Sequence, residues 1–337
     1  MPKIAIIYNE PVQSRYQATG EEKAITSIIW VVRAVNRALI SLNYQVSLIP
    51  LSLPLENAVS VLSSLDVDMV FNLFEGFPGY PETEAWLPDI LVKRHIAFTG
   101  CTSGTLSLAL NKGMTKELLR ASGISTPSHQ VLTMDNISNF HLQFPCIVKP
   151  AAEDASHGLD ENSLVNDFEA LSRQVKLIVD SYGKEALVEE FLEGREFNAT
   201  VLGTADCIVL PISEITYTLP PDKPKILTFA AKWDQDSIYY KCTPVICPAK
   251  IDEFDKKRIS DVALSAFRVI GCRGYARVDM RMDKNGVVNV IEVNPNPDIS
   301  PNTGAARQAK AAGMTYAQFI DKIISLANCA PVSELVP

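Results

Sequence analysis

The sequence predicts an α/β protein of three modules, in which the C-terminal part is of the α+β type. At 337 residues the chain exceeds the length that one hydrophobic core usually serves, about 250 to 300 residues. Hydrophobic residues make up 47% and charged residues 21%, as in ordinary globular proteins. Strand-like apolar runs alternate with segments of helical periodicity in the N-terminal third, which is typical of a parallel sheet covered by helices.

The first module is expected over residues 1–105. KIAIIYNE predicts a strand, residues 21–44 place apolar side chains at helical spacing, and YQVSLIPL returns to strand character. Buried strands follow in DVDMVFNLFEG and HIAFTG. Ligands of such parallel sheets gather at the carboxyl ends of the strands, here near Glu10, residues 72–76 and residues 99–102.

The second module is expected over residues 106–186. SLALNKGMTKELLRASG predicts a helix that ends at Gly123, with Pro127 beyond it. FPCIVKP predicts a short strand stopped by proline, and the small-residue loop AAEDASHG and a second helix follow it. These elements form a strand and helix set of their own.

The third module is expected over residues 187–330. From LVEEFLEGREFNATVLG onward, strands alternate with a proline-rich segment between Pro211 and Lys225. The module closes on a helix in MTYAQFIDKIISLA, where Thr315 and Gln318 predict a capping box.

Composition excludes several classes of partner and site. The net charge is −8 and no run of Lys or Arg longer than the KKR of residues 256–258 occurs, so neither nucleic acid nor an anionic membrane is expected as a partner. The seven cysteines are scattered without a CxxC pair and the four histidines lie far apart, which disfavours a zinc site or a disulfide framework. With no signal peptide or apolar span in view, a cytoplasmic protein with reduced thiols is expected.

The segment YARVDMRMDKNGVVNVIEVN predicts a β-hairpin around its Asn-Gly pair. With residues 285–286 as a two-residue turn, counting outward places Asp279 opposite Glu292 and Arg277 opposite Asn294. Since side chains alternate between the faces of a strand, all four project from one side of the hairpin.

Two carboxylates that face each other across a ladder repel, unless a positive charge lies between them. Asp279, Glu292 and the amide oxygen of Asn294 are a donor set that suits Mg²⁺. The alternative is that Arg277 and Arg281 neutralise the acids in a surface ladder.

Two lysines support a nucleotide site. Lys149 ends the strand in IVKP, directly before a loop of small residues, where its ammonium can meet a phosphate; Lys112 is the next candidate. The alternative for either lysine is a solvated surface charge. Neither the pattern GxxxxGK[ST] nor GxGxxG occurs, which argues against a P-loop or a Rossmann dinucleotide site.

The order of Lys112, VKP, VEEFLEGREF, RVD and EVN resembles the ATP-grasp family, and within it the D-alanine–D-alanine ligases. The similarity runs from about Asp68 to Ala327. It implies a three-module ATP-grasp architecture, with an N-terminal substrate module and ATP bound between the central and C-terminal modules. Relatives of this family are commonly homodimers, so a homodimer is one expectation.

The resemblance implies ATP and two Mg²⁺ ions, with Mn²⁺ as an alternative metal. The residues it assigns are Lys112 and Lys149 for the phosphates; Glu189, Glu190, Phe191 and Leu192 for adenine; Glu196 for the ribose; Ile291 for the base; and Asp279, Glu292 and Asn294 for the metals.

The chemistry that the resemblance implies is activation of a carboxylate to an acyl phosphate, which an amine then attacks. Arg277 would stabilise the oxyanion, and Lys232 in FAAKWDQ would close over the reacting groups. Ser156 in DASHG is retained from the loop that covers the nucleotide.

The segments that bind amino acids in this family differ here. The Gly-rich turn with a Ser and a Glu is absent from YNEPVQSRYQATGEE, and FEGFPGYPETEA replaces the HG and GEDG pattern. Asp298 and Thr303 occupy the acceptor positions, and Trp233 stands where a Tyr is usual. An extra carboxylate would repel a simple amino-acid carboxylate and would suit a cationic or hydroxyl-rich group.

These differences predict an ATP-dependent ligase of small-molecule carboxylates and amines whose substrate pair is not two D-alanines. Three alternatives stay open: a true D-alanine–D-alanine ligase of peptidoglycan synthesis, an enzyme that joins an amino acid to a mycosporine core, and a non-catalytic ATP-binding regulatory protein.

Overall fold

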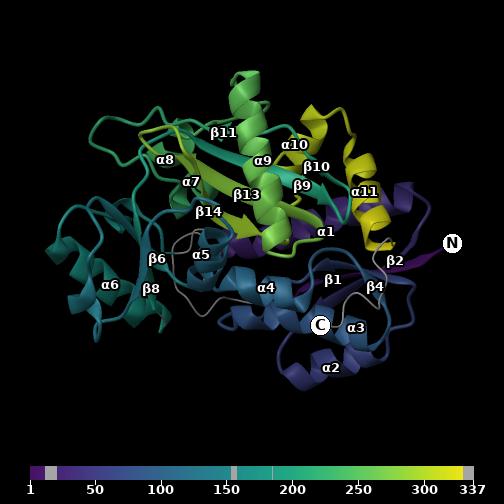
Figure 1. Ribbon diagram of the computed structural model, residues 1–337. Coiled ribbons are helices and arrows are strands. Elements are labelled where there is room, and N and C mark those ends of the chain that lie inside the picture. The colour runs from purple at the N-terminus through teal and green to yellow at the C-terminus, as the bar shows by residue number, and fades with distance from the viewer. Residues whose placement is uncertain (12–20, 153–157, 184, 329–337) are drawn as a thin grey trace.

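The computed structural model describes residues 1–11, 21–152, 158–183 and 185–328. Its strands form three sheets, which contain residues 3–98, 129–190 and 196–294 (Figure 1). The α/β prediction with an α+β C-terminal part is confirmed. The residue ranges of the three sheets correspond approximately to the three expected modules. The division into modules stays a prediction.

The N-terminal sheet is parallel, as its alternation of strands and helices predicts. Its order is β2 (Gln45–Leu51), β1 (Lys3–Asn9), β3 (Met69–Leu73) and β4 (Ala97–Phe98). One face packs on α1 (Glu21–Ser41), and the other packs on α2 (Leu55–Ser63) and α3 (Trp86–Lys93). Side chains alternate along β1, so successive residues reach the two cores in turn.

The central sheet is antiparallel, in the order β5 (His129–Leu132), β8 (Ala186–Glu190), β6 (Cys146–Pro150) and β7 (Leu164–Val165). Helix α6 (Phe168–Tyr182) buries Leu171, Val175 and Ile178 against it. The spacing of these three residues gives the helix one apolar face.

The third sheet carries the hairpin. Its order is β12 (Val245–Ile246), β11 (Ser213–Ile215), β9 (Glu196–Gly203), β13 (Gly274–Met282) and β14 (Val288–Asn294), with β10 (Cys207–Val209) beside β9. Helix α9 (Glu253–Val269) packs on this sheet (Figure 1). Two short helices, α7 (Phe229–Trp233) and α8 (Ile238–Cys242), follow the proline-rich segment.

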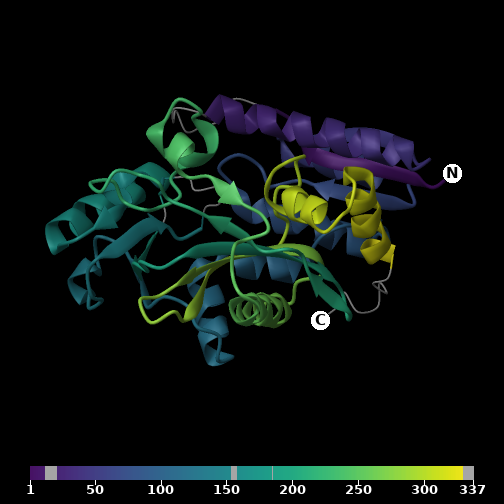
Figure 2. The same ribbon diagram turned by 90° about the horizontal axis from the view of Figure 1, so that it is seen from above.

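The last two helices join the C-terminal part to the N-terminal sheet. Helix α10 (Gly304–Ala311) leads to α11 (Tyr316–Asn328), which packs beside α1 in the first core (Figures 1 and 2). The predicted capping box is confirmed: the Thr315 N–H donates to Gln318 Oε1 at 2.8 Å, and the Gln318 N–H donates to Thr315 Oγ1 at 3.2 Å.

The single helix expected in SLALNKGMTKELLRASG is wrong. Two helices occur there, α4 (Ser103–Leu110) and α5 (Lys112–Ala121), because Asn111 interrupts the helix and caps the second one. Its Oδ1 accepts the Met114 N–H at 3.0 Å, a bond that a residue inside a helix does not make. The predicted end is confirmed, since Gly123 adopts φ +75°.

Among the described residues, no helix combines the length and the apolar content that crossing a membrane requires.

One contact ties the N-terminal sheet to the loop after β14. Asn296 Oδ1 accepts the Cys101 N–H at 3.1 Å. Gly100 lies beneath it at φ +89°, and a Cβ on this residue would lie 2.3 Å from Asn296 Oδ1. Only glycine fits both the backbone conformation and this close approach.

We therefore expect Gly100→Ala to lower the free energy of unfolding by about 1 to 3 kcal/mol through overpacking, in addition to backbone strain. Gly123→Ala is the matched control, because Gly123 also has positive φ, but a Cβ added to it would meet no atom of the described residues within 4 Å. Urea unfolding of both variants measures the difference. An equal loss in the two variants would contradict the importance of the Asn296 contact.

Candidate active site

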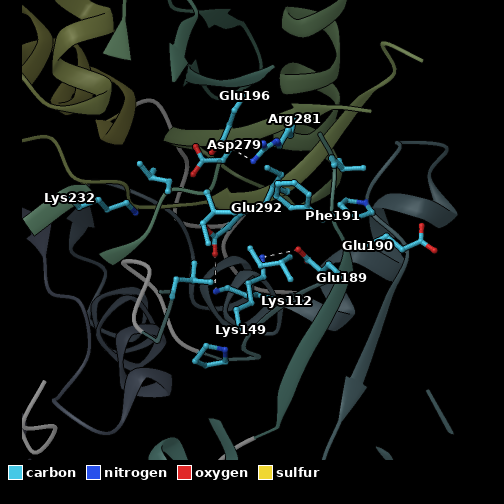
Figure 3. Close-up of a pocket in the computed structure, with 18 residues that line it drawn as sticks. Lys112, Lys149, Glu189, Glu190, Phe191, Glu196, Lys232, Asp279, Arg281 and Glu292 are labelled. Carbon is cyan, nitrogen blue, oxygen red and sulfur yellow. Dashed lines mark hydrogen bonds and ion pairs between the residues drawn. The ribbon is translucent and has the colours of Figure 1, made fainter. Parts of the chain in front are cut away.

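A pocket lies between the central sheet and the third sheet (Figure 3). It holds about 870 Å³ of empty space, its open mouth included. Its walls bring together most of the residues that the sequence nominates: Lys112, Lys149, Glu189, Glu190, Phe191, Leu192, Glu196, Lys232, Asp279, Ile291 and Glu292. Ser156 lies outside the described residues.

The β13–β14 hairpin confirms the predicted pairing. Arg277 is opposite Asn294 and Asp279 is opposite Glu292, so the four side chains lie on one face of the ladder. The two carboxylates therefore face each other at the edge of the pocket.

The predicted two-residue turn of the hairpin is wrong. The Asp283 N–H donates to Val287 O at 2.9 Å, so residues 284–286 form a three-residue turn. The strands then pair one residue out of step with the expected register as far as Ile291, which has no partner in the ladder and forms a β-bulge. The bulge restores the register, so two shifts of one residue cancel before the carboxylates are reached.

Glu292 is paired with the first residue of α5. Lys112 Nζ lies 2.8 Å from Glu292 Oε1 (Figure 3). Burial alone would raise the pKa of Glu292, but the ammonium groups of Lys112, Lys149 and Lys232 hold it well below its usual value. Glu292 is therefore ionised over the whole physiological pH range.

Glu189 lies between two ammonium groups. Its carboxylate is 3.1 Å from Lys149 Nζ and 2.7 Å from Lys116 Nζ. Burial raises the pKa of Glu189, and the two lysines more than offset this, so the pKa lies below its usual value. Its expected contact with adenine stays a prediction, and its neighbour Glu190 points away from the pocket in Figure 3.

Lys112 and Lys149 are not solvated surface lysines, because only 6% and 8% of these residues are exposed. That alternative is therefore wrong. Both ammonium groups are held by carboxylates inside the pocket.

Glu196 is paired across the sheet with Arg281. Their strands are neighbours, and Arg281 Nη1 lies 3.0 Å from Glu196 Oε2. The Tyr217 hydroxyl donates to the same oxygen at 2.6 Å. The Arg281 guanidinium also lies over the Phe191 ring, 4.6 Å from its centroid. Burial raises the pKa of Glu196 despite the arginine.

Asp279 is held by its neighbours on the same face. Arg277 binds it in bidentate fashion, with Nε to Oδ1 at 2.7 Å and Nη2 to Oδ2 at 2.8 Å. Asn294 Nδ2 donates to Oδ2 at 3.1 Å. The ion pair that the ladder alternative expects is thus present between Arg277 and Asp279, whereas Arg281 pairs with Glu196 instead. The metal role of Asp279 stays a prediction.

The oxygen donors at this place fit Mg²⁺. Two opposed carboxylates and one amide are hard ligands, and the remaining positions of a magnesium ion are usually filled by water and phosphate. Within the part of the chain that the structure describes, no group of three His, Cys, Asp or Glu side chains forms a metal site. The amide of Asn294 and the nucleotide would therefore have to complete the coordination.

The family model described as "D-ala D-ala ligase C-terminus" matches residues 118–325. The chain belongs to the D-alanine–D-alanine ligase family.

Relatives extend this similarity over most of the chain. The uncharacterized protein y4sG of Sinorhizobium fredii is 36% identical over 261 residues, which cover 77% of this chain and 74% of that protein. The D-alanine–D-alanine ligase of Carboxydothermus hydrogenoformans is 30% identical over 303 residues, covering 87% and 91%.

Solved structures share the fold. The D-alanine–D-alanine ligase from Bacillus anthracis complexed with ATP has a TM-score of 0.73 at 20% identity, and 97% and 98% of the two chains are covered. The VanG D-Ala:D-Ser ligase from Enterococcus faecalis has a TM-score of 0.71 at 21% identity, with 97% and 99% covered. The architecture is therefore that of ATP-grasp ligases. Membership of the family, shown by the family model and the curated relative, makes this chain an ATP-dependent ligase that forms carbon–nitrogen bonds.

Three residues that the sequence did not nominate for binding contact the nominated ones: Arg281, which lines the pocket, and Lys116 and Tyr217, which lie outside its lining. A signal existed for Lys116, because it follows Lys112 by four residues on one helix and so shares its face. Arg281 and Tyr217 gave none, since their contact with Glu196 depends on the order of strands in the sheet.

Lys232 and Trp233 lie on α7, and Lys232 lines the same pocket as Asp279 and Glu292. Lys232 points into the pocket in Figure 3, and burial together with the charge of Arg277 lowers its pKa. Trp233 Nε1 is buried and finds no hydrogen-bond partner among the described residues. The helix thus presents a cation to the carboxylate pair.

The expected role of Lys112 predicts the effect of its removal. Lys112→Met should raise the ligase's KM for ATP roughly 10- to 100-fold, because a charged hydrogen-bond donor is lost. Initial rates of ADP formation at varied ATP give this value. Lys93→Met is the control, since the Lys93 side chain is exposed and pairs with Asp89 on α3, outside the pocket lining. Equal KM values in the two variants would contradict a phosphate contact.

Glu292→Ala tests the metal site. We expect ADP formation to fall by about 10²- to 10³-fold, the usual cost of removing one electrostatic group from a reaction centre. Circular dichroism checks that the fold is kept. Glu169→Gln, which changes an exposed glutamate on α6, should leave the rate unchanged. Normal turnover by Glu292→Ala would exclude Glu292 as a metal ligand.

Proposed function

We propose that this ligase uses ATP to phosphorylate a small-molecule carboxylate and joins the acyl phosphate to an amine, with a substrate pair other than two D-alanines. The main support is the convergence of Lys112, Lys149 and Lys232 with the opposed carboxylates Asp279 and Glu292 in one pocket. Three ammonium groups in one pocket suit a polyphosphate, and the two carboxylates suit the metal ion that accompanies it.

Each charged group has a task in the proposed reaction. Lys112 and Lys149 bind and orient the phosphates, while Arg277 and Lys232 stabilise the charge that develops on the substrate oxygen. The base would lie on the apolar surface of Phe191, Leu192 and Ile291, next to Glu189 and Glu190. The ribose would be held by Glu196. Ser156 would belong to the loop over the nucleotide.

Asp279, Glu292 and Asn294 would hold two Mg²⁺ ions, with Mn²⁺ as an alternative. Bound metal would neutralise the charge on the transferring phosphoryl group. In this structure Lys112 and Arg277 neutralise the same carboxylates. Binding of metal and nucleotide would therefore exchange one set of ion pairs for another, which keeps the buried charge compensated at each stage.

The substrate proposal rests on a second cavity, which borders the loop after β14. Asn72, Glu75, Tyr275 and Asp298 line it, and its described lining contains no lysine, arginine or histidine. Asp298 accepts the Thr303 hydroxyl at 3.0 Å and so keeps Thr303 at its side. Asp298 would repel the carboxylate of a D-alanine there, whereas it would match a cationic or hydroxyl-rich group.

A true D-alanine–D-alanine ligase is the second candidate. It is favoured by the 30% identity to a protein of that name over 87% of this chain. A homodimer, as is common in the family, stays a prediction.

A screen of acid and amine pairs tests both candidates. ADP formation gives the rate and mass spectrometry gives the product, with D-alanine alone as a reference arm. We expect a cationic or hydroxyl-bearing pair to exceed the D-alanine rate by at least about tenfold, in keeping with a mismatch of one charge. A robust rate with D-alanine alone would establish the second candidate, and ATP binding without any ADP would leave a regulatory protein.

A further inference from the structure

Lys116 lies behind the wall of the nucleotide pocket and does not line it. Only 1% of the residue is exposed, and its ammonium has three partners. It lies 2.7 Å from Glu189 Oε1 and donates to Ile291 O and Thr126 Oγ1, both at 3.0 Å. Two of its N–H donors are thus used in hydrogen bonds, and the charge is balanced by the ion pair with Glu189.

These partners belong to opposite sides of the pocket. Glu189 is on β8 of the central sheet, and Ile291 is the bulged residue of β14 in the third sheet. Both also line the pocket. One side chain therefore holds a residue on each of the two walls that would enclose the nucleotide.

Hydrogen bonds from outside the sheet hold the bulge at Ile291. Strand β14 is at the edge of its described sheet, and Ile291 has no partner in the ladder. The loop before β5 bonds Val290, the residue that precedes Ile291. The Val290 N–H donates to Ser125 O, and the Thr126 hydroxyl donates to Val290 O, both at 2.8 Å. Lys116 adds the bond to the Ile291 carbonyl itself.

Lys116 also affects the charge around Lys149, the lysine proposed to bind phosphate, because both lysines pair with Glu189. Glu189 is shared between Lys116 and Lys149, one oxygen facing each ammonium. Without Lys116, Glu189 would have Lys149 as its remaining cation and would hold it more strongly. Burial lowers the pKa of Lys116 to about 8, an effect that Glu189 opposes.

We propose that Lys116 is a positioning residue for the nucleotide, which sets Ile291 and Glu189 at a fixed separation across the pocket. The proposal rests on the proposed use of ATP. A purely structural ion pair would affect stability and leave nucleotide affinity unchanged, so the two roles predict different measurements.

The test compares Lys116→Met with the wild-type chain. Isothermal titration calorimetry with Mg·ADP gives the Kd, and ADP formation gives kcat and the KM for ATP. We expect Kd and KM to rise at least about tenfold while kcat changes less than about threefold, because Lys116 touches no reacting atom.

Arg195→Met is the matched control for lost stability. Arg195 pairs with the buried Glu214 at 2.7 Å, outside the pocket lining. This variant should lower the melting temperature without changing Kd. If Lys116→Met does not fold, Lys116→Gln takes its place, since an amide can still donate to Ile291 O.

The outcomes separate this inference from the proposed function. A raised Kd in the Lys116 variant with an unchanged Kd in the Arg195 variant supports the positioning role. Wild-type affinity in the Lys116 variant overturns that role alone. Failure of the wild-type chain to bind Mg·ADP overturns the proposed use of ATP and this inference with it.

Discussion

The opposition of Asp279 and Glu292 across the β13–β14 ladder is the constraint on which the site depends. Two carboxylates directly opposite each other on a half-buried pair of strands repel, so the arrangement is unfavourable without nearby cations. The chain supplies Arg277 from the same strand and Lys112 from another module. The charge on the hairpin is thus compensated partly by helix α5, which lies outside the third sheet.

Two asparagine side chains, Asn111 and Asn296, help to place the neighbouring segments against the hairpin. Asn111 breaks a helix so that Lys112 begins a new one beside the hairpin. Asn296, after the same hairpin, bonds the backbone at Cys101 and reaches over Gly100. The segment after β4 and helix α5 therefore both contact the hairpin or the loop that follows it. The first contact needs glycine at position 100, and the second needs the Lys112 side chain.

The sequence could predict what depends on local patterns. Strand alternation, the capping box at Thr315 and the cross-strand partner of Glu292 follow from residue spacing. The expected pairing assumes a turn that is one residue shorter than the observed turn. The bulge at Ile291 shifts the register by one residue in the opposite sense, so the pairing of Glu292 is the same. A bulge forms where tertiary bonds hold the extra residue, here through Lys116, so counting along the sequence does not reveal it.

The sequence by itself determined the fold class, the order of the ATP-grasp segments and the set of carboxylates and lysines that share the pocket. Only the tertiary structure decided which charges pair: Glu189 with Lys116 as well as Lys149, and Glu196 with Arg281. The reason is physical. Periodicity places a side chain on a face, but the partner of a buried charge depends on which sheets and helices are brought against that face.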